Sequence, residues 1–313
     1  MNAVNNIVAR DPNTQIYTLY RRRFYVLAIF SFLSFNQCAF WITFSPISPS
    51  TQIFYGISSS TVDYLLNWGP IVFIPCLPLA YLLLNRKNGF RLIMIITTII
   101  SIVATLVRII PLIFISPSHP QFRTISVLFL HVGQILNAAC GPLVMAPVSQ
   151  LSCLWFSPNE RTRATTVAIM VNTFGATISF LINPSIVARP TNIPYLLYFH
   201  FALALLVAIP ALIYFPAEPP TAPSAAAELL MGGKENNTDS GLKAYIKGLQ
   251  QCATNRSFVL LVTVGGLMTG TFGLWTGLFS TILAFENYSE KQAGKFRRFL
   301  FLGLLYLDMH GFM

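Results

Sequence analysis

Charge is scarce in this sequence: Asp, Glu, Lys and Arg together make up 10% of the 313 residues, whereas hydrophobic residues make up 54%. Because an average soluble domain is about 25% charged, this composition is typical of a membrane protein. Polar residues do not alternate with apolar ones over about ten positions, as the strands of a membrane β-barrel require. We therefore expect an all-α membrane protein in contact with a lipid bilayer.

Patterns that carry catalysis or bind metal are also missing. The five cysteines form no Cys-x-x-Cys pair, so we interpret them as small buried hydrophobes and expect no metal site. No Ser/His/Asp set, pair of carboxylates or phosphate-binding glycine loop occurs in a plausible arrangement. We expect no enzyme activity and no cofactor. The net charge of +10 does not indicate a nucleic-acid partner, because the basic residues lie at the ends of apolar runs.

Long apolar runs are what the sequence does contain. About 20 helical residues cross a hydrocarbon core of about 30 Å. Seven runs reach that length: Phe24–Pro46, Tyr64–Leu84, Leu92–Ile115, Ile125–Leu151, Thr162–Val187, Ile193–Phe215 and Phe258–Phe285. The first is too long for a signal-peptide core, and no Ala-x-Ala cleavage site follows it. An eighth run, Phe299–Leu307, is too short to span unaided.

Basic residues predict the orientation, because Lys and Arg in short loops favour the cytoplasm. With a cytoplasmic N-terminus, 13 of them lie inside and only Arg123 and Arg189 outside, up to the end of the seventh run. The inner set is Arg10, Arg21, Arg22, Arg23, Arg86, Lys87, Arg91, Arg161, Arg163, Lys234, Lys243, Lys247 and Arg256. This orientation disfavours a seven-span receptor, and it places the glycosylation sequon at Asn287 outside.

The order of the runs predicts five segments. These are a cytoplasmic N-terminus (1–23), a six-helix half (24–215), a cytoplasmic linker (216–257), a seventh helix with its outer loop (258–294) and an atypical end (295–313). Six helices, a linker and further helices are the plan of a transporter built from two six-helix halves. Basic residues at 295–298 fall on the outer side, so we interpret the end as foreign or truncated. We expect this form alone not to transport; a nonfunctional or regulatory fragment is the alternative.

The stretch "WFSPNERTRATT" (155–166) gathers charge between the fourth and fifth runs. Ser157, Pro158 and Glu160 match the N-cap, first-turn and capping-box positions of a helix. We expect Arg161 and Arg163 to hold this end in the cytoplasm. Together with Glu160, and with Arg86 and Arg91 between the second and third runs, they are candidate gating contacts.

Several stretches resemble the major facilitator superfamily, and within it the feline leukaemia virus subgroup C receptor-related solute carriers, in the branch named for disrupted in renal carcinoma protein 2. They are "YRRRFYVLAIFSFLSFNQ", "WGPIVFIPCLPLAYLL", "GQILNAACGPLVMAP", "WFSPNERTRATT", "YFPAEPP" and "GTFGLWTGLFSTIL". The resemblance covers about residues 20 to 294. It implies the major facilitator fold, with a complete N-terminal six-helix half and a truncated C-terminal half.

The resemblance also implies a function. Kinship with the lysosomal branch implies proton-coupled export of a small vitamin-like solute, with pyridoxine the first candidate, by a protein that is monomeric at full length. Choline or ethanolamine and haem are alternatives within the family. The lysosomal membrane is expected in preference to the plasma membrane. Trp41 matches the first-span Trp of the choline-transporting relatives, whereas Gly141 stands where their fourth-span Gln would be.

Candidate solute-binding residues are Trp41, Gln134, Asn137, Gly141 and Trp275. An indole face attracts a cation or stacks on a flat ring; the alternative for either Trp is an interfacial belt. Gln134 and Asn137 lie three apart on one helix face and could point into one cavity, or could serve as interhelical hydrogen-bond donors. We expect Gly141 and Pro142 to loosen the helix that follows.

Ionisable residues in or beside spans are candidates for proton coupling, because charge in hydrocarbon is costly. Asp63 opens the second run, where the helix dipole alone would favour an acid. His131 lies inside the fourth run and could titrate between about pH 5 and 8; the alternative is a hydrogen-bonded packing residue. Arg108 is expected to snorkel toward the outer surface.

Overall fold

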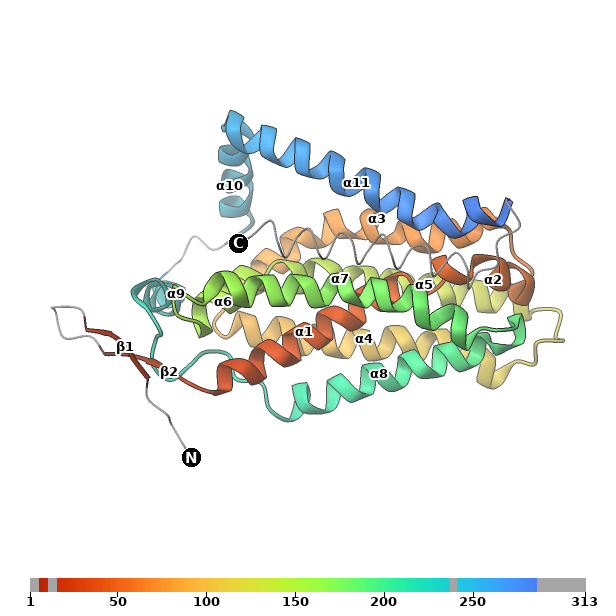
Figure 1. Ribbon diagram of the computed structural model, residues 1–313, viewed down its shortest axis with the longest axis horizontal. Coiled ribbons are helices and arrows are strands. Elements are labelled where there is room, and N and C mark those ends of the chain that lie inside the picture. The colour runs from red at the N-terminus through yellow and green to blue at the C-terminus, as the bar shows by residue number, and fades with distance from the viewer. Residues whose placement is uncertain (1–5, 11–15, 237–240, 286–313) are drawn as a thin grey trace.

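The computed structural model describes residues 6–10, 16–236 and 241–285, and it shows a long bundle of helices (Figure 1). The elements are β1 Asn6–Arg10, β2 Ile16–Leu19, α1 Arg22–Trp41, η1 Ser45–Ile47, α2 Ser48–Tyr55, α3 Ser59–Leu84, α4 Gly89–Phe114, α5 Phe122–Met145, α6 Val148–Trp155, α7 Arg161–Ile186, η2 Pro190–Asn192, α8 Ile193–Ile213, α9 Ala225–Asn236, α10 Leu242–Thr254 and α11 Arg256–Phe285. The antiparallel pair β1–β2 was not predicted.

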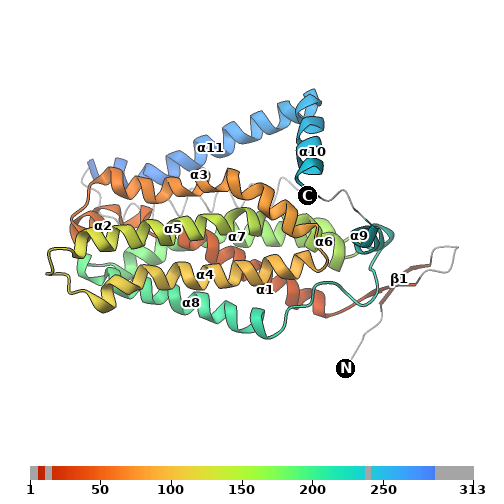
Figure 2. The same ribbon diagram turned by 180° about the vertical axis from the view of Figure 1, so that it is seen from behind.

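Six helical segments of the described chain are long and apolar enough to cross a membrane. They agree with the first six apolar runs of the sequence. The seventh run lies in α11, a helix of 30 residues that extends along the side of the bundle (Figures 1 and 2). Seen from behind, α3, α4, α5 and α8 run side by side along the long axis (Figure 2).

Prolines decide where the first span is interrupted. The helix α1 ends at Trp41, five residues before the apolar run does, and a turn of 3-10 helix at Ser45–Ile47 leads into α2. Pro46 lies in that turn and Pro49 in the first turn of α2. Each proline lacks an N–H and disfavours helical geometry in the residue before it, so the α-helix cannot run through. Backbone carbonyls near Trp41 are left without helical partners as a result.

The expected loosening of the fourth span at Gly141 and Pro142 is wrong. The helix α5 continues through both residues to Met145, and the chain bends at Ala146 and Pro147 before α6 begins. A proline inside a membrane helix is tolerated where neighbouring groups satisfy the freed carbonyl. The interruption comes at Pro147, which is the N-cap of α6.

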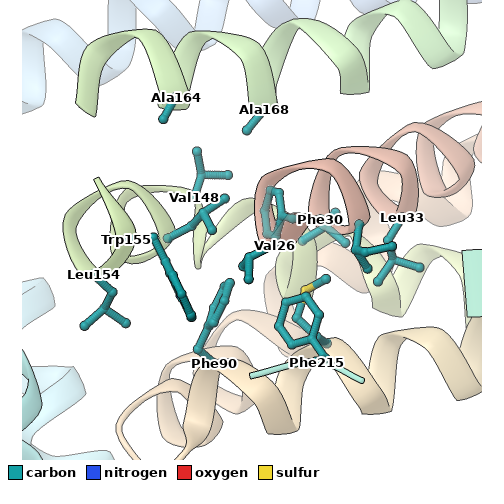
Figure 3. Packing of buried hydrophobic residues seen from close by; sticks show 14 of the residues in the cluster. Val26, Phe30, Leu33, Phe90, Val148, Leu154, Trp155, Ala164, Ala168 and Phe215 are labelled. Carbon is teal, nitrogen blue, oxygen red and sulfur yellow. The ribbon is translucent and has the colours of Figure 1, made fainter. Parts of the chain in front are cut away.

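Two apolar clusters hold the bundle, one toward each end. The Phe30 cluster includes Val26, Phe30 and Leu33 of α1, Phe90 of α4, Leu154 and Trp155 of α6, Ala164 and Ala168 of α7, and Phe215 (Figure 3). The Phe44 cluster joins Phe44, Ile47, Tyr55, Leu65, Ile109, Phe122, Leu130 and Leu196. Burying apolar side chains between helices supplies close packing, which is the main attraction between helices in a membrane.

A layer of buried polar side chains lies between these clusters along α1, α4 and α5. Its members are Asn36, Gln37, Ser101, Gln134 and Asn137, each less than 9% exposed. Because unsatisfied polar groups are costly in hydrocarbon, such a layer marks a place where the bundle must supply hydrogen bonds. The candidate site is built in this layer.

Candidate functional site

The interruption of the first span is the centre of the candidate site. Here the carbonyl of Trp41 accepts a hydrogen bond from Gln134 Nε2 at 3.1 Å, and the carbonyl of Thr43 accepts one from Asn183 Nδ2 at 3.0 Å. The carbonyl of Phe40 accepts from Thr43 Oγ1 at 2.7 Å. Side chains of α5 and α7 thus replace the helical partners that α1 loses at its end.

Two amide side chains of α5 keep a free acceptor at this level. Gln134 donates from Nε2 to the carbonyls of Trp41 and Leu65, and Asn137 donates from Nδ2 to the carbonyl of Gln37 at 3.1 Å. A carbonyl can only accept, so these bonds establish which end of each amide is nitrogen. The other ends, Gln134 Oε1 and Asn137 Oδ1, are buried and find no hydrogen-bond partner in the described part of the chain. Such acceptors are costly unless a donor reaches them.

The indole of Trp41 lies between α1 and α3. Its Nε1 donates to the carbonyl of Leu66 at 2.9 Å, and its ring packs with Cys38 of α1 and Phe180 of α7. Gly69 allows this approach, since a Cβ there would lie 2.3 Å from Trp41 Nε1. The N–H is therefore bonded inside the bundle and not directed to a membrane surface, where a belt tryptophan would use it.

Gly141 and Trp275 complete the expected solute-binding set. Gly141 faces Phe73 and Gln37: a Cβ on it would lie 3.3 Å from Phe73 Cδ2 and 3.6 Å from Gln37 Nε2. Glycine at this position therefore allows Phe73 of α3 to pack closely on α5 beside Gln37, a polar amide of α1 that the sequence did not single out. Trp275 falls on α11, whose side chains near it are outside the described part of the chain; α11 itself lies against η1 and α2.

Arg108 of α4 was expected to snorkel toward the surface, and this is wrong. It is 1% exposed; Nη1 donates to the Phe40 carbonyl and to Thr43 Oγ1, and Nη2 donates to the carbonyl of Gly133, all at 3.3–3.4 Å. Its cation therefore lies at the C-terminal end of α1, where the helix dipole favours positive charge. His200 of α8 joins this group through Thr43, with Nδ1 3.3 Å from Oγ1. The signal available in the sequence was charge inside an apolar run.

The two proton-coupling candidates are not brought together. Asp63 lies in the second turn of α3, partly exposed, and α3 has no acid in its first turn. His131 accepts a hydrogen bond at Nδ1 from Trp68 Nε1 at 2.8 Å. No hydrogen bond or ion pair joins Asp63 to His131 within the described residues. The bond from Trp68 fits the interpretation of His131 as a packing residue.

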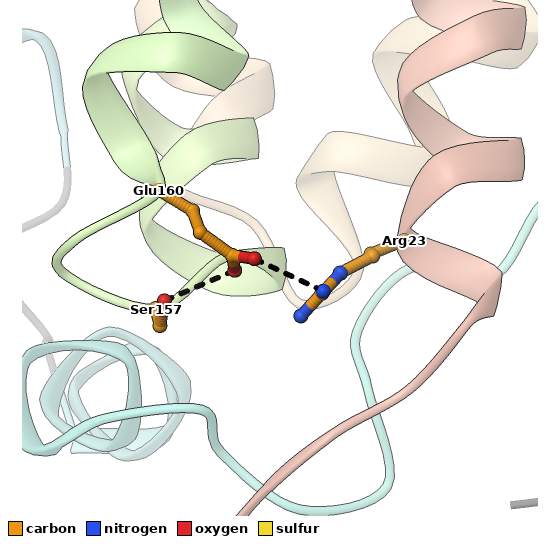
Figure 4. Close-up of polar contacts among 3 residues, drawn as sticks. All are labelled: Arg23, Ser157 and Glu160. Atoms are coloured by element: carbon orange, nitrogen blue, oxygen red, sulfur yellow. Dashed lines mark hydrogen bonds and ion pairs between the residues drawn. The ribbon is translucent and has the colours of Figure 1, made fainter. Parts of the chain in front are cut away.

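An ion pair closes the opposite end of the bundle, at the start of α1 (Figure 4). Arg23 Nη2 lies 3.1 Å from Glu160 Oε1, and Ser157 Oγ donates to Glu160 Oε2 at 3.0 Å. The Arg23 guanidinium also lies over the rings of Phe24 and Phe156, at 4.8 and 5.7 Å from their centroids. The pair joins α1 to the turn before α7, and the sequence counted Arg23 only as an orientation signal.

The expected capping box at this turn is wrong. The helix α7 begins at Arg161 with Glu160 as its N-cap, and no side chain caps it. Ser157 instead uses its carbonyl to accept from the backbone N–H groups of Glu160 and Arg161. Because Glu160 turns its carboxylate to Arg23, it does not reach back to the Ser157 backbone as a capping box requires.

The remaining basic residues of this end do not join the pair. Arg86, Arg91 and Arg163 are exposed. Arg161 Nη2 donates to Ser224 Oγ in the segment before α9, which ties the linker to α7. Of the expected gating residues, the structure therefore places Glu160 in contact with α1 and Arg161 in contact with the linker.

Metal ligands do not gather in the described chain: no group of three or more His, Cys, Asp or Glu side chains lies close enough to hold an ion. Cys38 and Cys140 are buried, as expected of small hydrophobes, while Cys252 is exposed. Asn287, the candidate glycosylation site, and residues 295–313 lie outside the described residues.

Known proteins resemble this chain over most of its length. It is 30% identical over 293 residues to the solute carrier family 49 member 4 homolog of Xenopus laevis, covering 88% of this chain and 60% of that protein. It is 28% identical over 284 residues to a choline/ethanolamine transporter of Homo sapiens, covering 88% of this chain and 51% of that protein. The chain thus spans about half to three fifths of the length of these relatives.

Solved structures support the fold class. The crystal structure of a D-xylose-proton symporter superposes with a TM-score of 0.54 at 16% identity, covering 90% of this chain and 65% of that one. The sequence profile of the Major Facilitator Superfamily matches residues 22–307. These findings, with the six membrane-length helices, confirm the all-α membrane fold expected from the sequence. The chain belongs to the major facilitator superfamily and is a multi-pass membrane protein.

Proposed function

We propose that the protein at its full length carries a small organic solute across a membrane by alternating access, and that the solute binds in the polar layer beside the interrupted first span. Broken helices near the middle of the bilayer line the substrate sites of many transporters. Trp41, Gln134 and Asn137 meet at such a break here. Gly141 allows Phe73 of α3 to approach this face of α5 closely, and Trp275 of α11 stays a further candidate.

One observation carries this proposal: among the residues that the structure describes, the buried oxygens Gln134 Oε1 and Asn137 Oδ1 meet no hydrogen-bond donor. A solute with hydroxyl, ring N–H or ammonium donors would satisfy both, and a flat ring or a cation would find the indole of Trp41 beside them. A pyridoxine-like vitamin has hydroxyl groups on a flat ring and fits both requirements. It is the first candidate, with export coupled to protons and a lysosomal location.

Ethanolamine and choline form the second candidate class. The relatives named choline/ethanolamine transporters favour it, at 26–29% identity. Ethanolamine carries ammonium and hydroxyl donors that could reach both oxygens, whereas choline has a single hydroxyl. The side of the membrane is proposed from the basic residues: the end that carries Arg23 and Glu160 is cytoplasmic, and their ion pair is a latch that must open when the site faces the cytoplasm.

Binding to the purified protein in lipid nanodiscs tests the site. Thermal shifts and radioligand binding with pyridoxine, ethanolamine, choline and haem would be compared for the unaltered protein and the Asn137→Leu and Gln134→Leu variants. Losing an acceptor that meets the solute should weaken binding about tenfold, since a buried hydrogen bond contributes about 1–2 kcal/mol.

A matched control is Asn172→Leu, which removes a partly buried amide bond between α7 and α1, from Asn172 Nδ2 to the carbonyl of Ser34. Its stability should fall, while the affinity for the solute stays unchanged. Equal affinity in all three variants would refute the placement of the site. Failure of all four solutes to bind would refute the proposed substrate classes.

A further inference from the structure

The helix α10 in the linker has two chemically different faces. Leu242, Ile246 and Leu249 follow one another at helical spacing and lie on one side, and they are 51%, 46% and 50% exposed. Lys243 and Lys247 lie one position further along each turn, on the adjoining side, and both are exposed. No side chain of α10 is buried, and within the described part of the chain about half of the surface of these three apolar side chains stays exposed.

The position of α10 relates this face to the membrane. In both views its axis runs across the long axis of the bundle, near the end where α1 begins (Figures 1 and 2). Tyr245 packs against Tyr81 in the last turns of α3, with ring centroids 5.1 Å apart. Only Asn255 separates α10 from α11, and its Oδ1 accepts from the N–H of Phe258. A helix held across the ends of spanning helices lies along the membrane surface.

The chemistry of α10 favours an anionic surface. Its sequence, LKAYIKGLQQCAT, holds two lysines and no acidic residue, and Arg256 follows at the start of α11. Helices that lie in the interface bury an apolar face among acyl chains and keep Lys or Arg on the polar side. Lysine side chains near such a surface reach the headgroups and are attracted by negatively charged lipids.

We propose that α10 is an interfacial helix that binds anionic phospholipids of the membrane that the bundle crosses. Leu242, Ile246 and Leu249 insert among the acyl chains, and Lys243 and Lys247 contact the acidic headgroups. The linker is thereby held against the bilayer at the end of the bundle that carries the Arg23–Glu160 pair. The proposal does not depend on the identity of the solute.

The test places an environment-sensitive fluorophore on α10 in the whole protein. The label is attached to Ile246→Cys on the apolar face, or to Gln251→Cys on the opposite face, with Cys252 and the partly exposed cysteines of the bundle replaced by serine. Neither position is buried, so the substitutions leave the bundle intact. The proteins are reconstituted in nanodiscs of phosphatidylcholine with or without phosphatidylserine.

The label at 246 should emit at shorter wavelength than the label at 251, and lipids with spin labels on their acyl chains should quench it several-fold more strongly. Phosphatidylserine should increase this quenching, and the double variant Lys243→Gln/Lys247→Gln should abolish the increase. Equal exposure of both labels to water would overturn the proposal. If the label at 246 is shielded from water but is not quenched by the lipid spin labels, protein covers the apolar face of α10. That result would also overturn the proposal. Quenching independent of phosphatidylserine would reject the anionic preference.

Discussion

Gly175 lies where the backbones of α7 and α1 approach each other closely, and adding one methyl group there should weaken the bundle. A Cβ on Gly175 would lie 2.4 Å from the carbonyl oxygen of Phe35 and 3.1 Å from its Cα and carbonyl carbon. All three are backbone atoms of α1, so no side chain can rotate away. Restoring an ordinary contact of about 3.4 Å requires the helices to part by about 1 Å at this point.

The expected cost follows from this geometry. Overpacking of a close contact costs about 1–3 kcal/mol, while replacing glycine by alanine inside a helix returns up to about 1 kcal/mol. Separation would also lengthen the bond from Ser179 Oγ to the carbonyl of Ala39, which is already 3.4 Å. We therefore expect Gly175→Ala to lower the free energy of unfolding by about 1–2 kcal/mol.

Reversible unfolding in mixed micelles or bicelles measures this difference. The matched control is Gly265→Ala in α11, where a Cβ would meet nothing within 4 Å. The control should be as stable as the unaltered protein or slightly more stable. If Gly175→Ala proves as stable as the unaltered protein, the backbones of α1 and α7 do not pack closely at this glycine.

Two other contacts give predictions of the same kind. Gly69→Ala should displace the indole of Trp41, since the new Cβ would lie 2.3 Å from Nε1. We expect the free energy of unfolding to fall by about 1 kcal/mol and solute binding to weaken, as measured by unfolding and radioligand assays. Unchanged binding would contradict the role of that indole. Arg23→Gln and Glu160→Gln should show a coupling energy of about 1 kcal/mol in a double-mutant cycle, which falls as salt rises, because the pair is partly buried at 3.1 Å. The exposed Arg163→Gln is the control and should show no coupling to Glu160; additive effects of the first two variants would dismiss the latch.

The spans could be read from hydropathy because the bilayer imposes a length and an apolar composition on each crossing helix. The six helices found agree with the runs predicted, from Phe24–Pro46 to Ile193–Phe215. The sequence also showed where the prolines of these runs lie, but it did not predict which of them ends a helix. Pro142 is accommodated inside α5, whereas Pro46 and Pro147 lie where the chain leaves the helix.

Only part of the candidate site could be predicted from the sequence. Gln134 and Asn137 stood out as polar residues on one face of an apolar run, and Trp41 through the family resemblance. Arg108 and His200 stood out only as weaker ionisable candidates, and their meeting at Thr43 was not predicted, since the three residues come from spans far apart in the chain. Hydropathy describes transfer of a residue from water, and it does not identify the partner that a polar group meets inside the bundle.

What the sequence determined by itself is the membrane class, the number and position of the first six crossing helices and the family, because these depend on local composition and on ordered motifs. Tertiary structure alone decided the destination of the polar groups: Arg108 at the end of α1 instead of the surface, Glu160 on Arg23 instead of a capping box, and two amide oxygens that meet no donor among the described residues. The physical reason is that a hydrogen bond or ion pair is determined by distances of about 3 Å between atoms, and those distances exist only after helices remote in sequence have packed together.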